Sequence, residues 1–486
     1  GNLNVIIGDN AGLVNTTGYN NVGVGGAALG ANTTGHNNTA IGFDSLRSFT
    51  TGNGRNTAVG AGSMYTTTTG YQNTAVGYNA LRNNTTGYMN VALGEHAGAG
   101  NTTGIENAFI GFGAGVANTS ASSNTFVGGY SGNVTITGAS NTGCGHNTLR
   151  ANTTGTKNTA VGKGALDTNT TGTSNVAMGV ECMDSNTTGG YNTAIGLNAM
   201  RLNSTADDNT AIGFSALEMN TTGTKNTAVG FRAMESCTTG NENTAVGWES
   251  LTTCDTGASN AALGFRAMHN ATSGHSSVCI GYYAGHNITT AGYNVLVGPE
   301  VGKVITTGAT NTGIGVYSAY ELTTGSNNTC LGSNAGRAAS PSGSLTTEDN
   351  RFCLGNNSVT NSYIKVDWTV TSDERDKADI TDFTHGLTYV NQLRPVNFVW
   401  DDRSDYEDGI SDGSKKKSDV QLGFLAQEVL AIETGLGIDN DAIVDTEDEN
   451  LLKMTNAKLI PVLVNAIKEL SAKNEALLAR IITLEG

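Results

Sequence analysis

The sequence predicts a mainly β protein: a parallel β-helix or β-roll solenoid, followed by a small α+β region ending in a coiled-coil helix. Three observations support this. The pentapeptide Asn-Thr-Ala-Val-Gly recurs at fixed spacing through the first 355 residues. The composition then changes near residues 356–371: 59 of the 66 glycines precede residue 361, whereas 24 of the 42 Asp and Glu follow residue 360. Finally, apolar residues at heptad spacing occupy residues 459–485.

The repeat is followed most easily by the glycine that closes this pentapeptide, called here the marker glycine. It defines 21 units of about 17 residues, with one step of 18 and a last step of 23. A short period over many copies is the signature of a solenoid, and helix-pair repeats need more than about 30 residues per unit. The markers run from Gly8, Gly25, Gly42, Gly60, Gly77, Gly94 and Gly111 to Gly332 and Gly355.

Each unit contains one short alternating run, which predicts a strand. In Asn73–Gly77, alternation places Thr74 and Val76 on one face and Ala75 on the other. We expect the Thr/Val face to line the inside of the coil, and the small Ala to mark a place that another surface approaches closely. An Ala-Leu segment follows, and an Asn-Thr-Thr-Gly turn closes the unit.

Stacked turns predict a rod. Because neighbouring strands lie roughly 4.7–4.9 Å apart, 21 turns make a rod of about 100 Å. Each turn offers only two to four modest apolar groups, which is little burial to offset the entropy of ordering a single chain. We therefore expect several chains, most simply three, to pack together as a homotrimer.

Five successive turns carry an aromatic residue directly after the marker glycine. Such a ladder predicts either rings stacked on one another, which we favour, or a platform for sugar rings. Ice binding is disfavoured, because the threonine pairs are adjacent and lie in a turn. A glycan-degrading enzyme is also disfavoured, because paired carboxylates and insertions are nearly absent. The five residues are Phe214, Phe231, Trp248, Phe265 and Tyr282.

All seven cysteines lie in the repeats, and their spacing fits no metal site. Cys237 and Cys254 occupy equivalent places on neighbouring turns, which allows either a disulfide or two buried thiols. Cys279, Cys330 and Cys353 replace the small Ala of the strand and are expected to pack in the rod. We expect neither a metal nor a cofactor.

The C-terminal region predicts alternating elements. Residues 386–400 indicate a short helix, a break at proline and then a strand, and residues 401–419 indicate a polar loop. Residues 421–432 indicate a strand that leads into a helix, and residues 446–454 indicate a turn that leads into the last element. A polar residue at one a position of a heptad seam typically fixes register, so a coiled coil is favoured over a helix that packs only on its own domain. The seam is Ile460, Leu463, Ile467, Leu470, Asn474, Leu477, Ile481 and Leu484.

The formal net charge of −16 argues against nucleic acid and anionic membranes as partners. The chain begins inside a repeat and without Met, so we expect it to be the C-terminal part of a longer protein. Neither a signal peptide nor a membrane-spanning run is seen.

Four motifs occur in a characteristic order in residues 366–486: SDERDK, GL…QLRPVNFVW, GFLAQEV and LIPVLVNAIKEL. In this order they resemble the C-terminal intramolecular chaperone of phage tail fibres and tailspikes, the peptidase S74 family. The repeats are more loosely similar to trimeric β-rolls of virion fibres and bacterial adhesin heads.

The resemblance implies a module that trimerises, helps the preceding stem to fold and then cuts itself off. Mapped onto this chain, Ser372 is the nucleophile, Lys377 the base, Asp373 an orienting residue and Thr371–Ser372 the scissile bond. A serine hydroxyl needs a neighbouring base, and a lysine serves when it is neutral. This makes the chain a single-turnover, self-cleaving serine endopeptidase with no other substrate. The alternative is a chaperone that has lost cleavage.

The predicted organisation is a shaft at 1–355, a junction at 356–371 and a chaperone at 372–486. The function expected first is a phage tail-fibre protein, located in the virion. Its partners would be itself, other tail proteins and a host receptor or glycan. The alternative is a trimeric adhesin on a bacterial surface that uses the same chaperone.

Overall fold

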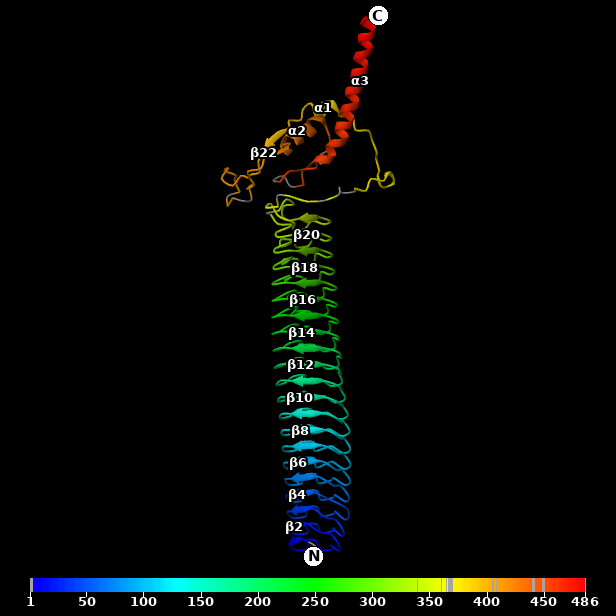
Figure 1. Ribbon diagram of the computed structural model, residues 1–486, viewed down its shortest axis with the longest axis vertical. Helices are drawn as coiled ribbons and strands as arrows, with labels where there is room; N and C mark the ends of the chain where they lie inside the picture. The colour runs from blue at the N-terminus through cyan, green and yellow to red at the C-terminus, as the bar shows by residue number, and fades with distance from the viewer. Residues whose placement is uncertain are drawn as a thin grey trace. The chain divides into compact units, whose positions relative to one another are not determined.

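The computed structural model describes the chain except residues 1–2, 339, 360, 364, 366–369, 404–405, 408, 439–441, 448–450 and 486. The chain forms two compact units, Gly1–Asn356 and Asn357–Gly486, which we describe separately (Figure 1). The predicted junction at 356–371 therefore falls in the second unit except for Asn356, and its residues 360, 364 and 366–369 lie outside the described part.

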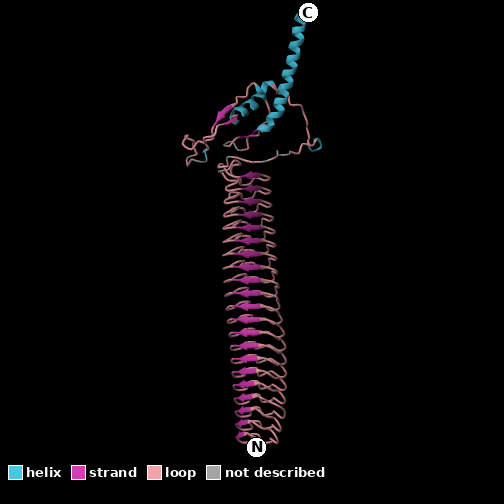
Figure 2. Ribbon diagram, viewed as in Figure 1, coloured by secondary structure: helices cyan, strands magenta, loops and turns pink. Residues whose placement is uncertain are grey.

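The first unit is a parallel β-solenoid, in which each turn contributes one three-residue strand (Figure 2). Each strand pairs with the strand of the next turn, as Thr74 does with Val91. The predicted solenoid of 17-residue turns is thus confirmed. The strands are β1 Val5–Ile7, β2 Val22–Val24, β3 Thr39–Ile41, β4 Thr57–Val59, β5 Thr74–Val76, β6 Val91–Leu93, β7 Ala108–Ile110, β8 Thr125–Val127, β9 Thr142–Cys144, β10 Thr159–Val161, β11 Val176–Met178, β12 Thr193–Ile195, β13 Thr210–Ile212, β14 Thr227–Val229, β15 Thr244–Val246, β16 Ala261–Leu263, β17 Val278–Ile280, β18 Val295–Val297, β19 Thr312–Ile314, β20 Thr329–Leu331 and β21 Phe352–Leu354.

The predicted inner and outer faces of the strands are wrong. From β2 to β21 the middle residue is the buried one, while its neighbours are half-buried or exposed, as in β5, where Ala75 is buried and Val76 exposed. The interior is narrow, since a Cβ on Gly23 would lie 3.5 Å from Leu29 Cδ1 and 3.1 Å from Ile6 Cδ1. Where the Ala-Leu segment has Leu or Met, this side chain turns inward with positive φ (47° at Leu81), and the strand then has room only for a small residue. Turns with Gly at that place admit a larger one, as Gly115 and Gly132 do beside Phe109 and Phe126.

Two ladders of buried asparagines join the turns. The backbone N–H of Asn73 donates to Asn56 Oδ1 of the preceding turn (3.0 Å), and its Nδ2 donates to Gly87 O (2.9 Å). In the second ladder, Asn101 Nδ2 donates to Asn84 Oδ1 (2.8 Å). Buried amides are costly unless they are hydrogen-bonded, and here the repeat supplies the partner from an adjacent or the same turn.

The side chains of the second asparagine ladder become apolar toward the C-terminal end of the rod. Up to Asn220 its positions hold Asn in most turns, and further on they hold buried apolar or thiol side chains. The later turns therefore bury more apolar surface per residue, which is the main favourable term in folding. The replacing residues are Cys237, Cys254, Ala271, Ile288, Ile305 and Leu322.

The marker glycines have a backbone conformation that other residues avoid. Gly128 has φ +127°, and a Cβ there would lie 2.3 Å from Gly145 O of the next turn. The adjacent Gly129 lacks such a φ, and a Cβ there would meet only the His146 side chain, at 3.3 Å. We expect Gly128→Ala to reduce the free energy of unfolding of the rod by about 3 kcal/mol or more, from backbone strain and overpacking.

Gly129→Ala is the matched control, with an expected loss below about 1 kcal/mol. Denaturant unfolding of the two variants, followed by circular dichroism, compares them directly. Equal unfolding midpoints would show that the marker position tolerates a side chain.

The second unit is a small α/β region ending in a helix, as predicted. Strands β22 and β23 pair antiparallel, and so do β24 and β25. Its core is formed by Tyr389 of α1, Val429 and Ile432 of α2, Ile443, Val444 of β24, and Leu459 and Val462 of α3. The elements are η1 Glu374–Asp376, α1 Leu387–Val390, β22 Val396–Phe398, β23 Gln421–Gly423, α2 Ala426–Leu436, β24 Val444–Asp445, β25 Lys453–Met454, η3 Asn456–Lys458 and α3 Leu459–Glu485.

Two carboxylates hold this unit together. Glu469 of α3 accepts the backbone N–H groups of Gly386 (3.1 Å) and Leu387 (2.9 Å) at the start of α1. Buried Glu433 of α2 accepts the N–H of Ile443 (2.8 Å). Gly386 has no room for a side chain, because a Cβ would lie 2.4 Å from Glu469 Oε1.

Helix α3 packs on the unit through Leu459, Val462 and Ala466 and leaves the predicted heptad seam exposed. Exposed fractions along the seam include 66% for Ile467 and 57% for Leu477. The coiled coil itself stays a prediction. Among the described residues, no helix has both the length and the apolar character of a membrane-spanning segment.

Candidate active site

One 3-10 turn, η1, brings the predicted dyad together. Asp373 is its N-cap, with the side chain accepting the backbone N–H of Arg375 (2.9 Å). Lys377 ends the turn, and its own N–H donates to Glu374 O (3.1 Å). The chain thereby folds back so that residue 377 lies beside residue 372.

The lysine side chain contacts the serine hydroxyl directly. Lys377 Nζ lies 2.7 Å from Ser372 Oγ and 3.4 Å from Ser372 O. This is the distance of a hydrogen bond through which a neutral amine can take the hydroxyl proton. Thr371, Ser372 and Lys377 are all exposed in the single chain.

Asp373 interacts with Arg375 rather than with the dyad. The guanidinium of Arg375 donates through Nε to Oδ1 (3.0 Å), and its terminal nitrogen donates to Oδ2 (2.6 Å). These side-chain bonds, followed by the backbone N–H of Arg375, lower the pKa of Asp373. The carboxylate therefore fixes the shape of the turn that carries Ser372 and Lys377.

Sequence reasoning assigned no role to Arg375 or Glu469. For Arg375 a local signal existed, because an N-cap Asp followed two residues later by Arg allows this bidentate contact. The partners of Glu469 lie 82 and 83 residues away in the sequence, so no local pattern could have found them.

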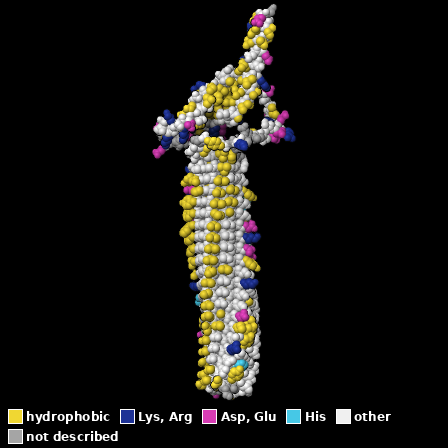
Figure 3. Space-filling model, viewed as in Figure 1, with side chains coloured by type: hydrophobic (Ala, Val, Ile, Leu, Met, Phe, Trp, Pro, Cys, Tyr) yellow, Lys and Arg dark blue, Asp and Glu magenta, His cyan; other side chains and the backbone are white. Residues whose placement is uncertain are grey.

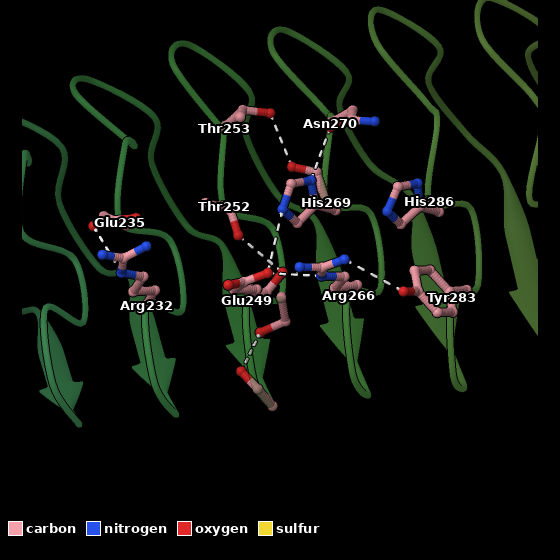
Figure 4. Close-up of polar contacts among 12 residues, drawn as sticks. Arg232, Glu235, Glu249, Thr252, Thr253, Arg266, His269, Asn270, Tyr283 and His286 are labelled. Atoms are coloured by element: carbon pink, nitrogen blue, oxygen red, sulfur yellow. Dashed lines mark hydrogen bonds and ion pairs between the residues drawn. The ribbon is translucent and has the colours of Figure 1, made fainter.

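The rod carries a polar network of its own on four neighbouring turns (Figure 4). Glu249 accepts a hydrogen bond from Arg266 Nε (2.6 Å), and Arg266 also reaches the Tyr283 hydroxyl (3.4 Å). Partial burial raises the pKa of Glu249, but Arg266, Trp248 and His269 together outweigh burial, so the pKa is lowered overall. His269 and His286 stack at 5.2 Å between ring centroids. These charges are matched within the network, which joins turns and leaves no unbalanced charge for a ligand.

The sequence left open whether Cys237 and Cys254 form a disulfide or are two buried thiols. Cys237 and Cys254 are free, buried thiols. Their mutual hydrogen bond and burial raise the pKa of Cys237, so this thiol is unreactive. Cys279, Cys330 and Cys353 are buried at middle strand positions, as expected. Among the described residues, no three His, Cys, Asp or Glu side chains form a cluster that could hold a metal.

Comparison with known protein families adds an independent observation. Residues 372–438 match the family model Peptidase_S74, described as the chaperone of endosialidase. The chain carries a domain of this family. The match to the Peptidase_S74 domain begins at Ser372, and the rod and α3 lie outside it. No curated protein and no solved structure matches the chain.

A Peptidase_S74 domain supports autoproteolytic chaperone activity. Joined to a parallel β-solenoid, it suggests a protein of the tail-fibre or tailspike kind that carries its own chaperone.

Proposed function

We propose that this chain is a phage tail-fibre protein whose C-terminal domain aligns three copies, drives folding of the rod and then cuts the Thr371–Ser372 bond. The observation that carries the proposal is the 2.7 Å contact between Lys377 Nζ and Ser372 Oγ at the first residue of the Peptidase_S74 match. The rod would remain in the virion as a homotrimeric shaft, and residues 372–486 would leave. Other tail proteins and a host surface receptor or glycan are the further partners we propose.

The cleavage is an acyl transfer followed by hydrolysis. Ser372 Oγ attacks the carbonyl carbon of Thr371 through a five-membered ring, while the neutral amine of Lys377 takes the hydroxyl proton. The C–N bond then breaks as the ammonium returns that proton to the leaving nitrogen. Water hydrolyses the resulting ester and leaves a carboxylate on Thr371 and a free amino group on Ser372. The chain consumes its only substrate, so each copy reacts once.

Folding is the trigger in this proposal. Ser372 and Lys377 are exposed in one chain, and removing an amine from water favours its neutral form. Packing of the other copies over η1 would supply that change and hold the bond in a strained geometry. An unassembled chain would then stay intact, which couples the cut to correct assembly.

A bacterial trimeric surface adhesin is the alternative within the same architecture. The sequence upstream of Gly1 separates the two: a virion-attachment segment favours the fibre, and a secretion signal favours the adhesin.

The proposal predicts two products of defined ends. After native purification, intact-mass spectrometry is expected to find one fragment ending at Thr371 and one beginning at Ser372. Chain recovered in denaturant from the insoluble fraction, which has not assembled, is the control and should stay at full length. A cut at any other bond would exclude Ser372 as the nucleophile.

A further inference from the structure

The rod exposes a continuous apolar stripe over nine successive turns. It consists of two ladders that flank the marker glycines, whose lack of side chains leaves only backbone between them. None of these side chains is buried. The first ladder ends each strand: Met178, Ile195, Ile212, Val229, Val246, Leu263, Ile280, Val297 and Ile314. The second follows each marker: Val180, Leu197, Phe214, Phe231, Trp248, Phe265, Tyr282, Pro299 and Val316.

The stripe is large for a surface meant to face water. Hydrophobic side chains form lengthwise bands on this unit (Figure 3). Exposed fractions reach 50% for Tyr282 and are 49% for Trp248 and 45% for Ile314. With about 150–250 Å² per aromatic side chain and less per aliphatic one, the stripe leaves on the order of 1,000 Å² of apolar surface uncovered. A typical monomer shows patches of about 300–600 Å², and a stable interface covers about 800 Å² per partner.

The aromatic rings in the stripe stack on one another along the rod. Phe231 and Trp248 stack at 4.0 Å between centroids with an interplanar angle of 19°, and Phe214 stacks on Phe231 at 5.2 Å. Phe231 therefore has a stacked ring on each side, and Phe265 stacks on Tyr282 at 5.5 Å, so these rings turn a face to a neighbour along the rod. Sugar rings bind to the faces of aromatic side chains, so this ladder is poorly suited as a sugar platform and well suited to pack against another apolar surface.

We propose that the stripe is the contact between copies of this chain, which lie parallel and in register. The apolar side chains repeat at the spacing of the solenoid turns, and a partner with the same axial repeat can match them turn by turn. A second copy of the rod has that repeat by construction. A globular partner would cover a few turns and leave the others exposed.

The residues that follow the marker glycines along the whole rod favour the parallel arrangement. On earlier turns the residue after the marker glycine includes Glu95, His146 and Lys163. In an antiparallel pair with full overlap, Phe265 would face Glu95 and Leu197 would face Lys163. Such a contact buries charges without partners, whereas a parallel pair places each aromatic ring beside its equivalent. The stripe also explains why a strand face that looks like core in the sequence lies on the outside of one chain.

This inference deepens the homotrimer of the proposed function by naming its surface, and charge substitutions test it. The double variant Val246→Glu/Leu263→Glu introduces two carboxylates into the stripe. Leu202→Glu/Met219→Glu introduces two outside the stripe on adjacent turns, where Leu202 is half-buried and Met219 exposed. Analytical ultracentrifugation of the rods should give a single-chain mass or aggregate for the first and the wild-type trimer mass for the second. A stripe variant that keeps the wild-type mass and unfolding temperature would overturn the proposal.

Register is tested on the wild-type chain. Cys144 ends strand β9 at the position equivalent to the first ladder, two turns before the stripe begins, and is exposed, whereas the other six cysteines are buried. A short bismaleimide should therefore link Cys144 of one copy to Cys144 of the next, giving linked chains on a denaturing gel that vanish in Cys144→Ser. No linking in a wild-type rod of oligomeric mass would overturn the in-register arrangement.

The two proposals fail in different ways. The fragment ending at Thr371 reports cleavage, whereas rod mass and Cys144 linking report the stripe. A cut rod that sediments as one chain overturns the stripe and leaves autoproteolysis standing. An uncut oligomer whose chains are linked through Cys144 overturns autoproteolysis and leaves the stripe standing.

Discussion

Ser372→Ala is expected to abolish self-cleavage and to leave a full-length, assembled chain. The change removes one exposed oxygen, so little packing is lost, while the attacking atom of the acyl transfer disappears. Intact-mass spectrometry should find only the 49.9 kDa chain where the parent gives two fragments. Ser418→Ala is the matched control, because Ser418 is an exposed serine of the same unit that bonds only to its neighbour Asp419 among the contacts described, and this variant should be cut like the parent.

Substitutions of Lys377 distinguish its role in accepting a proton from the effect of its positive charge. Lys377→Arg keeps a cation that can hydrogen-bond to Ser372 and preserves the turn, but guanidinium does not give up a proton in proteins. We expect this variant to assemble and to remain uncut, as Lys377→Ala should, with more risk to folding in the alanine variant. Cleavage that persists in Lys377→Arg, or a fragment ending at Thr371 in Ser372→Ala, would remove these residues from their assigned roles.

The repeat could be read from the sequence because its spacing is exact in most turns, but the inner face could not. Alternation divides Thr74 and Val76 from Ala75 without saying which side faces inward. The decision depends on Leu81, whose positive φ directs its side chain into a narrow interior. That conformation follows from the solenoid as a whole, so rules for isolated strands favoured the more apolar face.

In the C-terminal unit, too, some contacts could be predicted from the sequence and others could not. Ser372 and Lys377 were predicted from a motif, and η1 brings their side chains together over five residues. The cap that Glu469 provides for α1 joins segments more than 80 residues apart, and only the folded unit reveals it. Local contacts leave a pattern in the sequence, whereas contacts of that separation do not.

Residues 1–371 expressed alone are expected to yield insoluble or polydisperse material in place of a uniform trimer. Neighbouring turns are nearly interchangeable: Thr193 pairs with Thr210 as Thr210 pairs with Thr227. A slip of one turn between copies therefore costs little, and parallel β-structure forms slowly with exposed edges. A few turns do differ, such as those with Phe109 or Phe126 in the interior and the later ones with Ile288, Ile305 and Leu322, but most neighbouring turns do not.

In the proposed function, the C-terminal unit would supply the missing alignment, because the predicted seam on α3 includes a single polar position, Asn474, that can set register before the rod closes. Three samples should therefore differ: the fragment 1–371 made alone, the same fragment released from the full chain, and the uncut Ser372→Ala chain. Light scattering and thermal unfolding are expected to show uniform trimers of high and similar stability for the last two. If the fragment made alone forms soluble trimers with the mass and unfolding temperature of the released rod, the rod aligns itself and residues 372–486 are not its chaperone.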